Sequence, residues 1–136
     1  LPWHITIEVP SGLHCDSYPG PLGQVISNLI QNAMLHAFTG RHQGNLRISA
    51  SARSNGEIEM SFDDNGIGMS PAVLARIFDP FFTTRLGSGG SGLGLSVSHN
   101  IAIGVLGGSL SARSHLGQGS SFTLTFAAHA ATTQPT

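Results

Sequence analysis

The hydrophobic pattern of the chain changes its period between residues 37 and 46, and this change constrains the fold more than any other feature. In residues 22–37 the apolar side chains recur with helical spacing and form one stripe, as in a helix that packs on a core. In residues 46–52 and 58–62 apolar and polar residues alternate, which is typical of half-buried strands. The Ser-Asn-Gly at 54–56 between the two runs predicts a hairpin turn. A helix followed by an antiparallel pair of strands is therefore predicted.

Further elements flank this unit, and Pro21 suits the first turn of the central helix. The same signals predict strands at 3–9, 109–113 and 120–126, a short helix from Ser70-Pro71 to about Ile77, and a helix over 93–105 that stops at Gly107-Gly108. The sum is one α+β domain over residues 1–136, with helices on one face of a mostly antiparallel sheet. The tail, from about 129 to 136, is expected to fray.

The composition excludes several classes of protein. The 136 residues are 40% hydrophobic and 10% charged, with a net charge of −1, which favours a globular domain without a surface for nucleic acid or an anionic membrane. Cys15 is the single cysteine, so an internal disulfide is excluded and the reducing cytoplasm is the expected location. No apolar run approaches the roughly 20 residues that span a bilayer. If a longer parent protein is anchored in the inner membrane, other parts of that protein provide the anchor.

Asp63 and Asp64 are neighbours in sequence but belong to opposite faces of the predicted strand. Asp64 shares the parity of the apolar residues in this run, whereas Asp63 shares the parity of the polar ones. A buried carboxylate needs hydrogen-bond donors. One interpretation is a turn in which Asp64 and Asn65 bond local backbone amides; the other is a site where a ligand supplies the donor. Gly66 and Gly68 favour the ligand, because they let it approach the backbone closely.

Asn28 and Asn32 are four residues apart and therefore lie on one face of the predicted helix, at the edge of its apolar stripe. Asparagines at such boundaries are common and indicate no function by themselves. The functional alternative is that two side-chain carbonyls directed into a pocket hold Mg²⁺, which prefers oxygen ligands and usually keeps waters and substrate phosphates.

The stretch GSGGSGLGLS (87–96) places glycines at the start of a predicted helix, where backbone amides and the helix dipole favour an anion. A flexible surface loop is the alternative. Gly87, Gly89 and Gly92 match G-x-G-x-x-G, but no acidic residue follows the loop, so a dinucleotide fold is excluded. A P-loop and a eukaryotic-type protein kinase both need a lysine, and the chain has none. A nucleotide would be held by backbone amides, a metal and arginine, for which Arg85 is the candidate.

These pieces, in this order, resemble the GHKL ATPase superfamily, and specifically the catalytic, ATP-binding domain of bacterial sensor histidine kinases. The resemblance covers nearly the whole chain. The matching segments are NLIQNAMLHA (28–37) for the N box, DDNGIGM (63–69) for the G1 box, IFDPFFTTR (77–85) for the F box, GGSGLGLS (89–96) for the G2 box, and residues 107–126 for the closing hairpin.

The resemblance implies the Bergerat fold, a two-layer α/β sandwich with helices on one face of a mixed, mostly antiparallel sheet. ATP would lie between the helices and under a lid at about 83–92. By the same resemblance Asp64 would accept a hydrogen bond from the adenine amino group, with Ser120 assisting through water. Asn32 would coordinate Mg²⁺ and Asn28 would support the triphosphate. The other cofactor-binding residues implied are Gly66, Gly68, Arg85, Gly90, Gly92, Leu93, Gly94 and Leu95.

The implied activity is that of a protein-histidine kinase. The domain would bind Mg-ATP and donate the γ-phosphoryl group to a histidine on a separate, dimeric helical domain, which then serves a response regulator. Asn32 and Arg85 would be the catalytic residues, because phosphoryl transfer depends mainly on positioning and charge stabilisation. Phe81 and Phe82 would pack beside the lid or against the helical domain, whereas Phe78 fits core packing equally well.

Two departures from the family pattern stand out. Many members carry lysine or arginine three residues after the second N-box asparagine, where this chain has Leu35, followed by His36. The phosphoacceptor histidine is also missing, because no histidine is followed by Glu or Asp as in the usual H box.

Three other functions are alternatives, and the residues of this chain disfavour two of them. A hydrolase of the gyrase, Hsp90 and MutL kind would need a glutamate four residues before the metal asparagine, and Asn28 stands there. An anti-sigma-factor-like serine kinase has the same fold. A non-catalytic interaction module would not need Asp64 or the loop glycines.

Overall fold

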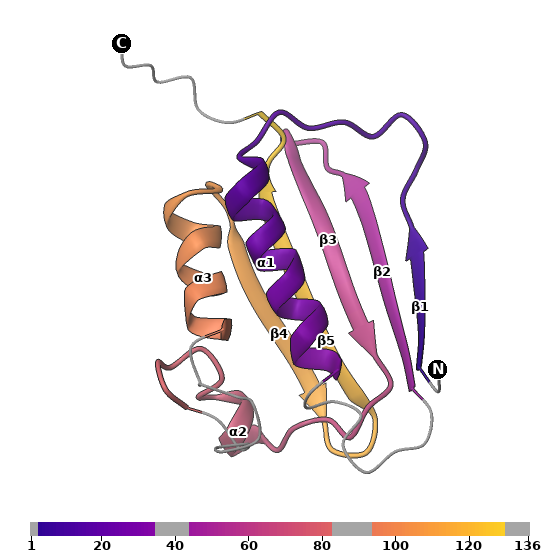
Figure 1. The fold of residues 1–136 in the computed structure, drawn as a ribbon, viewed down its shortest axis with the longest axis vertical. Helices are drawn as coiled ribbons and strands as arrows, with labels where there is room; N and C mark the ends of the chain where they lie inside the picture. The colour runs from indigo at the N-terminus through magenta and orange to yellow at the C-terminus, as the bar shows by residue number, and fades with distance from the viewer. Residues whose placement is uncertain (1–2, 35–43, 83–93, 130–136) are drawn as a thin grey trace.

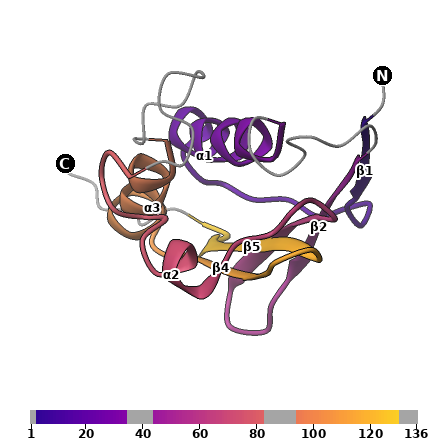
Figure 2. The ribbon, with the colours of Figure 1, turned by 90° about the horizontal axis from the view of Figure 1, so that it is seen from below.

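In a computed structural model of the chain, residues 3–34, 44–82 and 94–129 are described. One five-stranded sheet carries α1 and α3 on one face, so the chain forms two layers (Figures 1 and 2). The short helix α2 lies against β4. The elements are β1 (Trp3–Glu8), α1 (Pro19–Asn32), β2 (Gly44–Ala52), β3 (Glu57–Asp64), α2 (Pro71–Leu74), α3 (Gly94–Gly104), β4 (Ser109–His115) and β5 (Gly119–Ala127).

The strand order in the sheet is β1-β2-β3-β5-β4. Among the described strand pairs, β1–β2 is parallel and the other three are antiparallel. The predicted hairpin turn between β2 and β3 is confirmed, with the Arg53 amide donating to the Glu57 carbonyl at 2.8 Å. The expected mixed, mostly antiparallel sheet with helices on one face is therefore confirmed. Because β5 lies between β3 and β4, the last strand of the described chain is an internal strand of the sheet.

The core lies between the sheet and the helices, as the alternation in the strands predicts. Phe62 of β3 and Phe122 of β5 are opposite each other in register and are 1% and 3% exposed. The stripe on α1 supplies Val25 and Leu29 from the other layer. The remaining buried hydrophobic residues are Ala33, Leu46, Ile48, Ile58, Ile77, Ala102, Leu106, Leu110, Leu124 and Phe126.

The helix boundaries agree only in part with the predicted ones. Helix α1 begins at Pro19, and the prediction that Pro21 lies in its first turn is confirmed. Ser70 caps α2, its hydroxyl accepting from the Val73 amide at 3.2 Å, but the helix ends at Leu74 and not near Ile77. After Leu74 the backbone changes to tighter turns, in which the Arg76 amide donates to the Val73 carbonyl.

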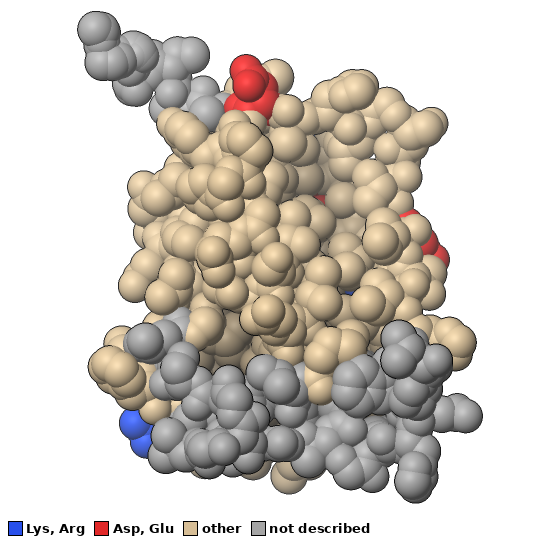
Figure 3. Space-filling view, in the orientation of Figure 1, with Lys and Arg blue, Asp and Glu red and all other residues tan. Residues whose placement is uncertain are grey.

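The β1 edge of the sheet extends beyond the cover of α1 (Figure 2). Ile5 and Ile7 stand in register with the buried Leu46 and Ile48, yet they are 47% and 67% exposed. The face that carries α1 and α3 shows acidic and basic atoms only at a few places in its described part (Figure 3). Within the described residues, no helix combines the length and the apolar character needed to cross a bilayer.

Candidate functional site

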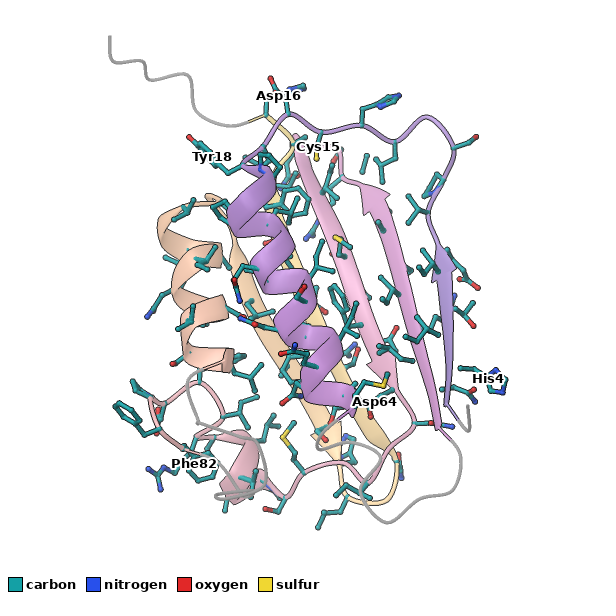
Figure 4. The ribbon with its side chains drawn as sticks, viewed as in Figure 1. His4, Cys15, Asp16, Tyr18, Asp64 and Phe82 are labelled. Atoms are coloured by element: carbon teal, nitrogen blue, oxygen red, sulfur yellow. The ribbon has the colours of Figure 1, made fainter. Side chains whose placement is uncertain are left out.

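A row of polar side chains crosses the helix-covered face of the sheet at one end. Asp64 of β3 is opposite Ser120 of β5, and Ser120 is opposite Ser114 of β4. The next row along is apolar, with Phe62, Phe122 and Ala112 in the same register. Because register partners project to the same face, the three polar groups lie side by side over the end of the core. Figure 4 shows Asp64 at this end of β3.

Asp64 is buried, with 9% of its surface exposed. Its Oδ1 accepts hydrogen bonds from the Gly66 amide at 2.9 Å and from the Ser120 amide at 3.1 Å. Asp63 is half-buried and accepts from the Ser121 hydroxyl on the opposite face of the sheet. The parity prediction for the two carboxylates is confirmed. The bond to Gly66 is the local turn that the first interpretation predicts, and the bond to Ser120 ties the carboxylate to a distant strand.

Two glycines allow the loop after β3 and the turn between β4 and β5 to interlock. Gly68 has φ +72°, and a Cβ there would lie 2.0 Å from the His115 carbonyl oxygen. Gly119 has φ +103°, and a Cβ there would lie 2.1 Å from the Asp64 carbonyl oxygen. Both positions combine a backbone conformation that favours glycine with a close backbone approach. The backbone beside Asp64 is therefore held by main-chain packing at two points.

Ser114 joins the loop to the row and was not predicted as a site residue. Its Oγ accepts from the Met69 amide at 2.7 Å and donates to the Gly119 carbonyl at 2.8 Å. It also lies 2.8 Å from the Ser120 Oγ. The parity of β4, in which Leu110 is buried, would have placed Ser114 on the inner face. Its neighbours could not be found that way, because they depend on strand order.

The two asparagines of α1 have different surroundings. Asn28 Nδ2 donates to the Ser98 Oγ at 2.9 Å and to the Gly94 carbonyl at 3.3 Å. Ser98 is fully buried and itself donates to the Gly94 carbonyl at 2.8 Å. Asn28 thus holds the first turn of α3 against α1.

Asn32, the last residue of α1, is half-buried. Its side chain makes no hydrogen bond within the part of the chain that the structure describes. Its amide oxygen is the kind of ligand that Mg²⁺ accepts, and a single such oxygen is compatible with an ion that keeps waters and phosphates. Among the described residues there is no cluster of three or more His, Cys, Asp or Glu side chains that could hold a metal.

The structure describes only part of the predicted glycine loop. Arg85, Gly90, Gly92 and Leu93 lie outside the described residues. Gly94 begins α3, and Leu95 is half-buried and packs against the core. The described arginines are Arg47, Arg53, Arg76 and Arg113, and all but Arg113 form ion pairs with carboxylates.

The aromatic residues after α2 differ in their packing. Phe78 packs against the core and stacks on His99 with ring centroids 4.8 Å apart. Phe82 lies under the Arg76 guanidinium, which is 4.6 Å from the ring centroid. Phe81 is 71% exposed and has φ 65°, a backbone conformation that non-glycine residues rarely adopt. Phe78 is therefore a packing residue, and the strained Phe81 presents its ring to solvent.

Comparison with known proteins places this chain in a family. The family model described as "Histidine kinase-, DNA gyrase B-, and HSP90-like ATPase" matches residues 18–130. The two-component sensor PprA of Pseudomonas aeruginosa is 44% identical over 104 residues, which are 74% of this chain and 11% of that protein. The sensor histidine kinase ZraS of Escherichia coli is 41% identical over 106 residues, which are 78% of this chain and 21% of that protein.

Solved structures agree with the sequence relatives. The nucleotide-free catalytic domain of histidine kinase ThkA superposes with a TM-score of 0.79 at 25% identity, over 93% of this chain and 80% of that one. Full-length ShkA in complex with AMPPNP superposes with a TM-score of 0.76 at 31% identity, over 95% of this chain and 27% of that one. The fold is therefore the α+β fold of histidine kinase catalytic domains.

The chain belongs to the family of histidine kinase-, DNA gyrase B- and HSP90-like ATPases. The predicted family and fold are thereby confirmed, and the family implies use of a nucleotide. The chain spans 11% of the length of PprA and 21% of the length of ZraS.

Proposed function

We propose that this domain binds Mg-ATP and donates the γ-phosphoryl group to a histidine on a separate helical domain. The observation that carries the proposal is the meeting of three elements at one end of the molecule. The C-terminal ends of α1 and β3 lie there (Figure 1), and the Asn28–Gly94 bond adds the first turn of α3. The family membership and the names of PprA and ZraS as sensors support the same activity.

The purine would lie at the polar row. Asp64 offers carboxylate oxygens beside Ser120, in a rigid setting held by backbone amides. A buried acceptor of this kind favours a ligand that carries a matching hydrogen-bond donor. The adenine amino group is such a donor. The complex of ShkA with AMPPNP, an analogue of ATP, supports a nucleotide in this fold.

The triphosphate would extend from the purine toward the start of α3. The backbone amides at this N-terminus favour an anion, and Gly94 and Leu95 are the described residues there. Asn32 would hold Mg²⁺, which supplies charge neutralisation to the phosphates. Asn28 would act indirectly, because its amide group already donates to Ser98 and Gly94. Arg85, Gly90, Gly92 and Leu93 complete the proposed phosphate site.

In the transfer step, the main role of the chain is to orient the nucleotide. The γ-phosphorus–oxygen bond to ADP breaks while a new bond forms to the histidine nitrogen of the acceptor. No general base is needed for this, and Asn28 stands where the hydrolases of the family have glutamate. A histidine acceptor is therefore favoured over water. The helical domain, its dimerisation, the response regulator and a cytoplasmic location complete the proposal.

Calorimetry on the 136-residue chain tests the binding part. Asp64→Asn keeps an oxygen that can accept from Gly66 and Ser120, so the fold should survive, whereas ATP affinity should fall at least about tenfold. In parallel, removal of Mg²⁺ should weaken ATP but not adenosine, and Asn32→Ala should abolish that difference. Unchanged ATP affinity in Asp64→Asn would contradict the adenine assignment.

A further inference from the structure

The hydroxyl of Ser114 has three neighbours, and together they determine its hydrogen-bond directions. A serine hydroxyl has one proton to donate and two lone pairs to accept with. The Gly119 carbonyl can only accept, so the Ser114 proton points to it, 2.8 Å away. The Met69 amide can only donate, so it occupies one lone pair at 2.7 Å. The contact of 2.8 Å with Ser120 must then use the second lone pair.

This arrangement also determines the direction of the Ser120 hydroxyl. Since Ser114 has no further proton, Ser120 Oγ is the donor in their contact. The Ser120 hydroxyl donates its proton to Ser114 within the sheet. The lone pairs of the Ser120 Oγ can still accept hydrogen bonds from other partners. Ser120 lies between Ser114 and Asp64 in register. Asp64 and Ser120 therefore both present acceptors at the place proposed for the purine.

We propose that Ser114 is a positioning residue that holds Ser120 as an acceptor and so makes the site prefer a 6-amino purine over a 6-oxo purine. The inference rests on the proposed function. Adenine presents an amino donor at this edge, directly or through a water, whereas hypoxanthine presents a carbonyl oxygen. Two acceptors facing that oxygen leave it without a hydrogen bond, which a buried site penalises.

Without Ser114 the Ser120 hydroxyl is free to turn its proton toward the ligand. A carbonyl at position 6 then gains a donor, and the adenine amino group loses an enforced acceptor. The preference for ATP over ITP should therefore fall. General loosening of the site would not change this preference. Loosening through the lost Met69 bond would weaken both nucleotides alike.

The experiment measures the dissociation constants of ATP and ITP by calorimetry on the 136-residue chain. Ser114→Ala should reduce the ratio of ITP to ATP dissociation constants roughly five- to tenfold, the size of one reversed hydrogen bond. Ser111→Ala, an exposed serine on the same strand, is the matched control and should leave the ratio unchanged. Ser120→Ala should lower the ratio by itself, and adding Ser114→Ala to it should change nothing more.

The outcomes separate this inference from the proposed function. A wild-type chain that binds no ATP overturns the proposed function and the inference together. A wild-type chain that binds ATP, with the ratio unchanged in Ser114→Ala, overturns only the inference. If Ser114→Ala does not fold, Ser120→Ala decides, because an unchanged ratio in that variant also excludes Ser120 as the discriminating group.

Discussion

At the residue scale, glycine shapes the proposed site as much as the polar side chains do. Gly119 brings the turn between β4 and β5 so close to β3 that no Cβ fits beside the Asp64 carbonyl. This approach lets the Ser120 amide reach the Asp64 carboxylate. The rigidity of the proposed purine site therefore depends on a residue that contributes no side chain.

Gly119→Ala should lower the free energy of unfolding by about 2–5 kcal/mol, because left-handed strain adds to a backbone clash. Gly117→Ala is the matched control, since φ is +80° but nothing lies within 4 Å of its Cβ position. It should cost only about 1 kcal/mol from strain. Chemical denaturation of both variants measures the difference. Equal losses would show that the close approach to Asp64 contributes nothing.

At the element scale, α1 and α3 are joined by a buried polar contact and not by apolar packing alone. Asn28 donates to the Ser98 hydroxyl and to the Gly94 carbonyl, and Ser98 is fully buried. Buried polar groups are expensive to leave without partners. The contact therefore sets how the first turn of α3 sits against α1.

Ser98→Ala should destabilise the domain by about 1–2 kcal/mol, because Asn28 loses its buried acceptor. A double-mutant cycle with Asn28→Ala should give a coupling energy of about 1 kcal/mol. Thermal unfolding of the four proteins measures it. Strictly additive losses would mean that the asparagine and the serine do not stabilise each other.

The sequence predicts the elements better than their contacts. The alternation in residues 46–52 and 58–62 gave both strands and the hairpin turn, since all the interacting groups are close in the chain. The end of α2 was predicted too late, because the change to tighter turns after Leu74 leaves the apolar pattern intact. The partners of Asn28 are 66 and 70 residues away and could not be read from a helical pattern.

At the scale of the whole molecule, the fold brings the segments of the proposed site together at one end. Asp64 and Phe82 lie at that end, whereas Cys15, Asp16 and Tyr18 lie at the other (Figure 4). The Asp16 amide donates to the Ala128 carbonyl at 2.6 Å, so the segment before α1 is tied to the residue after β5. The proposed site is thus remote from this junction.

The isolated chain should turn over ATP slowly and should transfer phosphate when a helical domain with an acceptor histidine is added. The reason is that Asn28 cannot activate water as a glutamate would. Radiolabelled γ-phosphate on the acceptor, measured against free phosphate release, checks this. Rapid phosphate release by the chain alone would favour a hydrolase, and replacing the acceptor histidine by alanine controls for phosphorylation elsewhere.

The sequence by itself determined the strands and helices, the inward position of Asp64 and Ser120, and the glycines that allow tight turns. These features follow from interactions between residues that are near in the chain. Side chains repeat with a period of two residues in a strand and of about 3.6 residues in a helix. Only the tertiary structure decided that β5 lies between β3 and β4, and therefore that Asp64, Ser120 and Ser114 form one row. The direction of the Ser120 hydroxyl follows from its contact with Ser114, whose own hydroxyl accepts from the Met69 amide, 45 residues away in the chain and brought near only by the folded structure.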